Sequence, residues 1–222
     1  GVEGGGGGWR RGSGEGVGGL GRKGVGEGRP AGAGGNAGEG AVGDLEAKRE
    51  EGRAWQIAGL KEPLGCMTAE TIGIGTVEEM AEAASRLSSA PLIKVKLDAK
   101  LVIERMQAIH DNAPGARLII DPNEGWTVDL LREVAPPLKA MGVEMLEQPV
   151  PAGDDEGLRD YDCPILLCAD EACHTKEGLG DLVGKYQMIN IKLDKTGGLT
   201  EAIALAKAAT EQGFEIMVGC MV

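Results

Sequence analysis

Five charged residues, one at the end of each of five successive apolar runs, are the residues in this sequence most able to do chemistry. They are Lys96, Asp121, Glu147, Asp170 and Lys192, and between 22 and 26 residues separate each from the next. Each run reads as a buried strand, and the step between runs fits one strand, one helix and two turns. A parallel sheet that closes into a barrel brings the carboxyl ends of its strands to one mouth. We therefore expect three carboxylates and two lysines to face one another there.

The three carboxylates predict a metal site. Asp121, Glu147 and Asp170 would supply only oxygen ligands, which is the preference of a hard cation that keeps open positions for water or substrate. Zinc is disfavoured because neither His110 nor His174 lies at a strand end. The expected cofactor is Mg²⁺.

The lysines on either side of such a cation predict proton-transfer chemistry. Alternation along a strand puts Lys94 on the same face as Lys96, and Asn123 on the same face as Asp121. Neighbouring positive charge and burial are expected to lower the pKa values of the lysines, so that a neutral amine can act as a general base. The cation would stabilise the enolate that forms when the α-proton of a carboxylate substrate leaves.

The chain from residue 68 to residue 222 has the pattern of one barrel domain. Thr76 and Glu79 have the spacing of a capping box that opens a helix, and Pro136 and Pro137 are expected to break or kink a later one. Seven strands are predicted, the last at residues 215–220, and the sequence ends two residues later. We therefore expect an α/β fold, a parallel TIM-like barrel that lacks its closing strand.

Composition separates the first 60 residues from the rest. The first 43 residues hold 21 of the 38 glycines, so residues 1–60 are expected to be a low-complexity, disordered segment. Basic and acidic residues balance there, which leaves the net charge of −12 on residues 61–222 and argues against nucleic acid or an anionic membrane as a partner. No signal core or run of 18 apolar residues is visible, and the five cysteines form no zinc-like pairs, so a cytoplasmic protein is expected.

Several short motifs around these residues resemble those of the enolase superfamily, in its muconate-lactonizing subgroup. The motifs are Lys94-Val-Lys96, Asp121-Pro-Asn123, Glu147-Gln-Pro149, Ala169-Asp-Glu171 and Lys192-Leu-Asp-Lys195. The run from Asn190 to Thr200, together with Gly219-Cys-Met221, is similar to the dipeptide epimerases of the L-Ala-D/L-Glu type. The resemblance covers residues 68–222.

The resemblance implies a (β/α)7β barrel preceded by a capping domain, and a role for each residue of the cluster. Asp121, Glu147 and Asp170 would hold Mg²⁺, while Lys96 and Lys192 would stand on opposite faces of the substrate α-carbon. Three neighbours would support these five. Lys94 would tune Lys96 and help to neutralise the substrate carboxylate, and Asn123 and Glu171 would orient ligands or bases, with ordinary strand-end hydrogen bonding as their alternative. The capping domain, and the closing strand with its Asp-x-Asp element, have no counterpart in the sequence.

The function expected from this resemblance is Mg²⁺-dependent dipeptide epimerisation by two-lysine 1,1-proton transfer. A cycloisomerase or o-succinylbenzoate synthase of the same superfamily could use the same residues. A non-catalytic truncated fragment is the third alternative, since the glycine-rich start and abrupt end differ from the family's pattern. The substrate would be a small molecule, and a homo-oligomer remains open.

Overall fold

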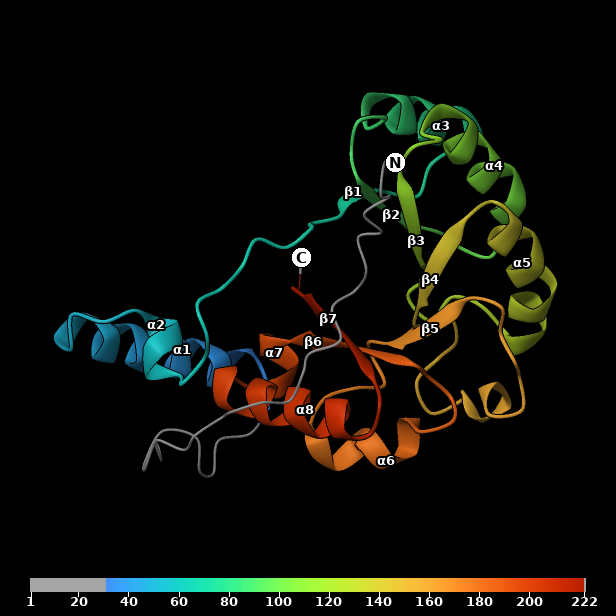
Figure 1. The fold of residues 1–222 in the computed structure, drawn as a ribbon. Helices are drawn as coiled ribbons and strands as arrows, with labels where there is room; N and C mark the ends of the chain where they lie inside the picture. Colours follow the sequence, from blue (N-terminus) through green and yellow to red (C-terminus); the bar gives the residue numbers. More distant parts are fainter. Residues whose placement is uncertain (1–30, 222) are drawn as a thin grey trace, which may run out of the picture. The chain divides into compact units, whose positions relative to one another are not determined.

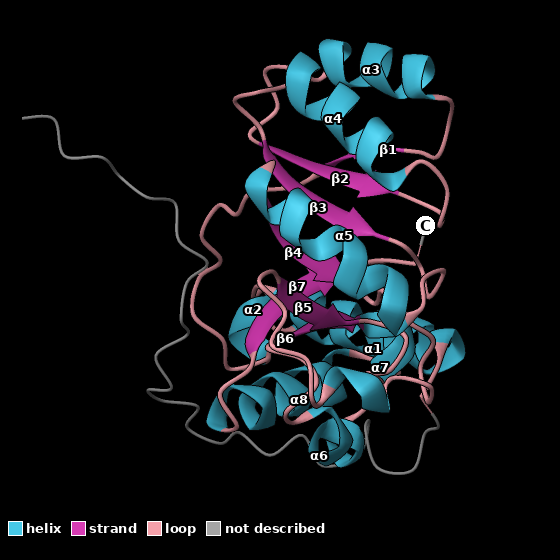
Figure 2. Ribbon diagram, turned by 90° about the vertical axis from the view of Figure 1, so that its right-hand side faces the viewer, coloured by secondary structure: helices cyan, strands magenta, loops and turns pink. Residues whose placement is uncertain are grey.

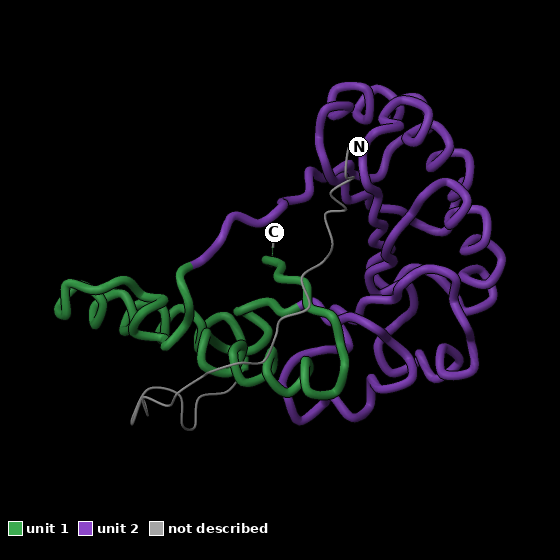
Figure 3. Tube along the Cα trace, in the orientation of Figure 1, with its two compact units in different colours: residues 1–62, 191–222 green, residues 63–190 purple. Residues whose placement is uncertain are grey.

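The structure is a computed structural model that describes residues 31–221, and the chain divides into two compact units. Unit 2 comprises residues 63–190, and unit 1 comprises residues 1–62 together with residues 191–222 (Figure 3). Seven parallel strands follow one another in sequence order, β1 to β7, and alternate with helices (Figure 1). The expected α/β fold, an incomplete TIM-like barrel, is confirmed.

Unit 2 is built from repeated strand–helix pairs. Its elements are β1 (Glu70–Ile72), α3 (Val77–Arg86), β2 (Leu92–Lys96), α4 (Val102–Asn112), β3 (Arg117–Asp121), α5 (Val128–Ala140), β4 (Val143–Glu147), η1 (Glu156–Leu158), β5 (Leu166–Ala169), η2 (Lys176–Gly178), α6 (Leu179–Leu182) and the first three residues of β6 (Met188–Lys192). Helices α3, α4 and α5 lie side by side on the outer face of the strands (Figure 2). The apolar side chains of β2, β3 and β4 are buried, as is typical of parallel strands that are covered on both faces.

The strand registers bring the carboxyl ends of neighbouring strands level. Lys96 pairs with Asp121 across β2 and β3, and Glu147 pairs with Cys168 across β4 and β5. Asp170 therefore lies two residues past the partner of Glu147, on the same face of the strand. The sheet thus gathers these charged ends at one edge of unit 2.

Helix α3 begins as the sequence predicts. Thr76 and Glu79 form the expected capping box, in which each side chain accepts a hydrogen bond from the other residue's backbone N–H. A break or a kink is expected from the sequence at Pro136 and Pro137, and the break is wrong because α5 runs through both prolines. Each proline removes one backbone donor, but the apolar face that includes Leu131 stays buried against the sheet and offsets the loss.

Unit 1 contains helices where the sequence analysis expected disorder. Its described elements are α1 (Ala33–Arg49), α2 (Ala54–Ile57), the last two residues of β6, α7 (Leu193–Thr196), α8 (Leu199–Glu211) and β7 (Glu215–Gly219). Glycine inside a helix costs about 1 kcal/mol relative to alanine, but α1 packs against α2, α7 and α8. Tertiary packing of this kind supplies most helical stability. Residues 1–30, also expected to be disordered, lie outside the described residues. None of the helices between residues 31 and 221 combines the length and the hydropathy needed to cross a bilayer.

Helix α1 is tied to the start of α8 by a buried carboxylate. Glu39 Oε1 accepts hydrogen bonds from the backbone N–H and the hydroxyl of Thr200, both at 2.7 Å. Gly198 precedes α8 with a φ of +147°, and a Cβ atom there would overlap the Glu39 carboxylate. Asn36 Nδ2 donates to Asp194 Oδ1 at 2.8 Å, which adds a second tie to α7. The segment that follows β6 is therefore held by the N-terminal helix.

Replacing Glu39 by alanine is expected to destabilise the chain. The change leaves a backbone N–H of α8 and a hydroxyl without their acceptor, and hydrogen bonds to a charged group are worth about 1.5–3 kcal/mol. Glu39→Gln keeps an acceptor oxygen and should lose less. Denaturation followed by circular dichroism measures both, with Glu50→Ala at the exposed end of α1 as the matched control. Equal stability of Glu39→Ala and Glu50→Ala would show that this contact does not hold α1.

Candidate active site

The carboxyl ends of β2, β3 and β4 hold a buried network of charges. Asp121, Glu147 and Asp170, the last just past the end of β5, are 1%, 0% and 1% exposed. Burial of a carboxylate costs free energy unless a positive charge or hydrogen bonds compensate it. For Asp121 and Glu147 the compensating positive charges come from the two lysines of β2. This is the grouping that the sequence predicts for residues of unit 2.

Lys94 lies between two of the carboxylates. Its Nζ atom is 2.7 Å from Asp121 Oδ2 and 2.6 Å from Glu147 Oε2. Burial alone would lower the pKa of Lys94, but the charges of Glu147 and Asp121 and its hydrogen bonds to them outweigh burial and raise that pKa. The Lys94 ammonium is itself the cation between these two carboxylates.

Lys96 stands at the rim of the same network. Its Nζ atom donates to Asp121 Oδ2 and to Asn123 Oδ1, both at 2.6 Å. Asn123 has a left-handed backbone, with a φ of +46°, and its N–H donates to Asp121 Oδ1 at 2.9 Å. Asn123 Nδ2 also donates to Glu171 Oε1 at 3.4 Å. Asn123 and Glu171, which the sequence analysis selected, therefore contact each other, and Asn123 contacts both Lys96 and Asp121.

Repulsion and burial act together on Glu147. Burial and then the charge of Asp121 raise the pKa of Glu147, and Lys94 opposes the rise. Burial, followed by the charge of Asp170, likewise raises the pKa of Glu171. Negative charge therefore raises both pKa values, and an added cation beside these carboxylates would favour their ionised forms.

Two residues of this edge carry roles that the sequence analysis did not assign. Asn190 Nδ2 donates to Glu147 Oε1 at 2.8 Å, and Gln148 contacts the backbone of Asp170. Asn190 precedes Lys192 by two residues, so strand alternation could have placed it on the same face. The role of Gln148 depends on how its side chain crosses to β5, which no spacing rule gives.

The carboxylate oxygens of Asp121, Glu147 and Asp170 are the kind of ligand that a hard divalent cation prefers. Asp121 Oδ2 and Glu147 Oε2 already converge on one positive charge, the Lys94 ammonium. Asp170 is buried beside them, and its charge acts on Glu147. Within residues 31–221, no three acidic, histidine or cysteine side chains are arranged as a formed metal cluster. The structure thus unites two of the expected ligands around a cation and places the third nearby.

Lys192 is the remaining residue of the predicted set. It is the last residue of β6, directly before α7, and it belongs to unit 1. Its backbone is extended, with φ −121° and ψ 127°, and its side chain is partly exposed. Helix α7 follows it directly and is held by Asn36 through Asp194, while Glu39 holds Thr200 at the start of α8.

Two curated relatives are similar to the chain over most of its length. An L-Ala-D/L-Glu epimerase of Escherichia coli (strain K12) is 50% identical over 194 residues, covering 86% of this chain and 60% of the relative. An N-acetyl-D-glutamate racemase of Pseudoalteromonas sp. is 48% identical over 193 residues, covering 87% of this chain and 61% of the relative. The chain therefore spans about 60% of the length of these relatives. Any continuous stretch that covers 86% of the chain includes residues 33–49, so helix α1 lies within the aligned region.

A solved structure and a family model extend the comparison. A dipeptide epimerase from Cytophaga hutchinsonii, complexed with Mg and the dipeptide D-Ala-L-Val, superposes with a TM-score of 0.79 at 26% identity, covering 84% of this chain and 53% of that one. The family model described as "Enolase C-terminal domain-like" matches residues 76–222, which include every residue of the charged network. The resemblance to this superfamily and its dipeptide epimerases is confirmed, and the chain belongs to the enolase C-terminal domain-like family.

Proposed function

We propose that this chain carries the catalytic core of a Mg²⁺-dependent epimerase that inverts the α-carbon of an N-acylated amino acid by 1,1-proton transfer. The observation that supports it most is the pairing of a partly exposed amine, Lys96, with the buried carboxylate of Asp121, next to the pair of Lys94 with the buried Glu147. A base beside a cation-binding edge is what abstraction of a weakly acidic α-proton requires.

Asp121, Glu147 and Asp170 are the proposed ligands of the metal. Bound there, Mg²⁺ would supply positive charge to a substrate carboxylate and so stabilise the enolate that forms when the α-proton leaves. Lys94 would remain as a second positive charge, hydrogen-bonded to Glu147 or Asp121. Asn190 would keep Glu147 oriented through its 2.8 Å hydrogen bond.

In the proposed reaction, two lysine side chains act on the α-carbon from opposite faces. One amine takes the α-proton from one face, and the ammonium of the other delivers a proton to the opposite face. No electrons are gained or lost, and the product differs from the substrate only in configuration. We assign these two roles to Lys96 and Lys192. Asn123 holds the Lys96 amine at 2.6 Å and so limits its motion.

The substrate class follows from what the two relatives have in common. One is named for a dipeptide that ends in glutamate and the other for N-acetylglutamate, at 50% and 48% identity. Both compounds carry an acylated nitrogen on the α-carbon of glutamate. L-Ala-Glu is the first candidate substrate, and N-acetylglutamate is the second, which the Pseudoalteromonas relative favours.

Epimer formation from the two candidates tests the proposal. Each compound is incubated with the chain and Mg²⁺, and chiral chromatography measures the opposite epimer at the glutamate α-carbon. We expect turnover of L-Ala-L-Glu, with slower or no turnover of N-acetylglutamate. A chain that turns over only N-acetylglutamate is a racemase of the second kind, and one that turns over neither contradicts the proposal.

A further inference from the structure

The side chain of Gln148 makes four hydrogen bonds inside unit 2. Its Oε1 atom accepts from the backbone N–H of Asp170 at 2.9 Å and of Ala172 at 3.1 Å. Its Nε2 atom donates to the carbonyl oxygen of Val150 and to the hydroxyl oxygen of Tyr186, both at 2.9 Å. An amide side chain offers two donors and two acceptor positions, so all of them are used in this fully buried group.

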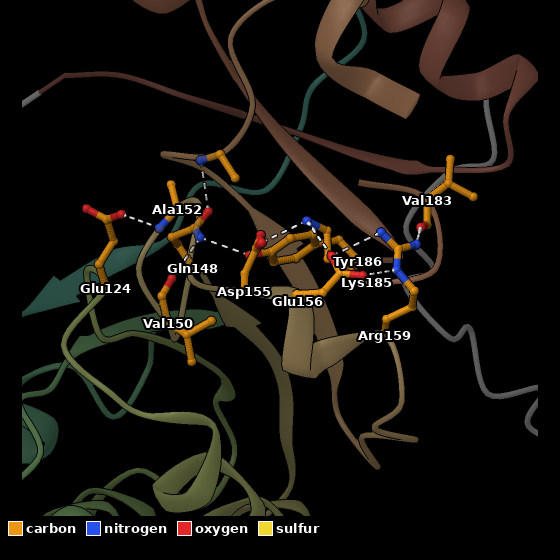
Figure 4. Close-up of polar contacts among 11 residues, drawn as sticks. Glu124, Gln148, Val150, Ala152, Asp155, Glu156, Arg159, Val183, Lys185 and Tyr186 are labelled. Carbon is orange, nitrogen blue, oxygen red and sulfur yellow. Dashed lines mark hydrogen bonds and ion pairs between the residues drawn. The ribbon is translucent and has the colours of Figure 1, made fainter. Parts of the chain in front are cut away.

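The Gln148 amide continues into a buried chain of polar side chains (Figure 4). The Tyr186 hydroxyl donates to Asp155 Oδ2 at 2.9 Å, and Lys185 Nζ donates to Asp155 Oδ1 at 2.7 Å. Asp155, Lys185 and Tyr186 are all buried. We call the four connected side chains of Gln148, Tyr186, Asp155 and Lys185 the β4–β6 network. Its only carboxylate, Asp155, is neutralised by the ion pair with Lys185.

The directions of these hydrogen bonds are fixed by chemistry. Backbone N–H groups can only donate and the Val150 carbonyl can only accept, which settles the two ends of the Gln148 amide. Burial and then the charge of Asp155 raise the pKa of Tyr186, so its hydroxyl stays protonated and donates to Asp155. The hydroxyl oxygen is thereby left to accept from Gln148. A flip of the amide would break all four contacts.

The backbone of Gln148 is held as firmly as its side chain. Its φ is +36°, in the left-handed region that costs free energy for a residue with a side chain. The strain is offset by hydrogen bonds on both sides, since its N–H donates to Cys168 O at 2.8 Å and its carbonyl accepts from Glu124 N–H at 2.9 Å. Gln148 directly follows Glu147, and hydrogen bonds on both sides hold its strained backbone in place. This strain points to a role at the carboxyl ends of the strands rather than to core packing alone.

We propose that Gln148 is a positioning residue, which sets the backbone of Asp170 relative to Glu147, and that the β4–β6 network fixes the Gln148 amide for that task. This inference rests on the proposed function, in which Asp170 and Glu147 are metal ligands. Gln148 directly follows Glu147 in the sequence, and its side chain accepts a hydrogen bond from the backbone N–H of Asp170. It therefore sets the spacing of two carboxylates that lie on different strands.

Mg²⁺ titration of the 222-residue chain by isothermal calorimetry tests the proposal. Gln148→Met keeps the shape but removes all four hydrogen bonds, and we expect affinity for Mg²⁺ to fall about 10–100-fold, as for other groups that orient metal ligands. Tyr186→Phe removes one hydroxyl from the network, and a smaller fall of at least about threefold is expected on the same grounds. Tyr161→Phe is the matched control, because the other tyrosine of the chain lies outside the network, and its affinity should equal that of wild type.

Backbone amide exchange measured by NMR separates positioning from folding. Without added metal, the N–H groups of Asp170 and Ala172 should exchange with solvent faster in Tyr186→Phe than in Tyr161→Phe. All titrations are run at a temperature where circular dichroism shows the variant folded. If Gln148→Met does not fold, Tyr186→Phe decides the question.

The outcomes distinguish this inference from the proposed function. Variants that lose thermal stability but bind Mg²⁺ as wild type does would overturn the positioning role, even if the wild-type chain epimerises its substrate. Variants that behave as expected in a chain without epimerase activity would support positioning and overturn the epimerase alone. A wild-type chain that binds no Mg²⁺ would overturn both the metal part of the function and this inference.

Discussion

Replacing Lys96 by alanine is expected to abolish epimerisation while leaving the Mg²⁺ affinity within a few-fold of wild type. A positioned general base contributes about 10²–10⁴-fold to a proton-transfer rate, and the methyl group of alanine offers no substitute. Lys96 contacts Asp121 Oδ2, but Lys94 contacts the same atom, so the carboxylate keeps a cationic partner after the change. The rate is measured by chiral chromatography of the L-Ala-Glu product, and the affinity by calorimetry.

Lys139→Ala provides the matched control for Lys96→Ala. Lys139 lies in the last turn of α5, exposed and in the same unit as Lys96. Its removal should change neither the rate nor the Mg²⁺ affinity. Retention of more than a tenth of the wild-type rate by Lys96→Ala would contradict the role of Lys96 as a base.

Replacing Glu147 by glutamine is expected to remove the stabilisation by Mg²⁺ without destabilising the metal-free chain. Burial and the charge of Asp121 raise the pKa of Glu147, so the ionised carboxylate costs folding free energy. For an acid with a raised folded-state pKa, this cost is absent below the unfolded-state pKa and complete above the folded-state pKa. The metal-free variant should therefore melt at or above the wild-type temperature at high pH, with the difference vanishing in acid.

The metal response of Glu147→Gln is measured in the same melting experiment. A ligand at 100 times its Kd stabilises the folded state by about 2.7 kcal/mol, so the wild-type chain should gain several degrees in Mg²⁺. Glu147→Gln should gain little or nothing. Glu144→Gln makes the same change on the same strand, where Glu144 pairs with Arg117, and should keep the full metal response. A Glu147→Gln chain that still melts higher in Mg²⁺ would show that Glu147 is not a ligand.

Strand periodicity explains how much of the site the sequence could predict. Each of these mostly apolar strands ends in a charged residue at a nearly constant spacing, so the edge formed by Lys96, Asp121 and Glu147 follows from that spacing. Strand alternation likewise places Lys94 on the face of Lys96. These are local rules, and they hold where each residue's position depends on its own strand.

The features that the sequence could not predict depend on contacts between distant segments. Gln148 reaches Asp170, Ala172 and Tyr186, which are 22 to 38 residues away along the chain. The helix α1 contains five glycines, yet it forms because α7 and α8 provide a surface for it and Glu39 finds Thr200.

Lys96 and Lys192 are proposed to act on opposite faces of one α-carbon, and deuterium exchange at that carbon tests this assignment. L-Ala-L-Glu and L-Ala-D-Glu are each incubated in D₂O and Mg²⁺ with wild type, Lys96→Ala and Lys192→Ala, and NMR follows the glutamate α-proton. Wild type should exchange the α-proton of both epimers. Each variant should exchange the α-proton of only one epimer, and that epimer should differ between the two variants. Exchange of the same epimer by both variants, or of neither epimer by wild type, would contradict this assignment.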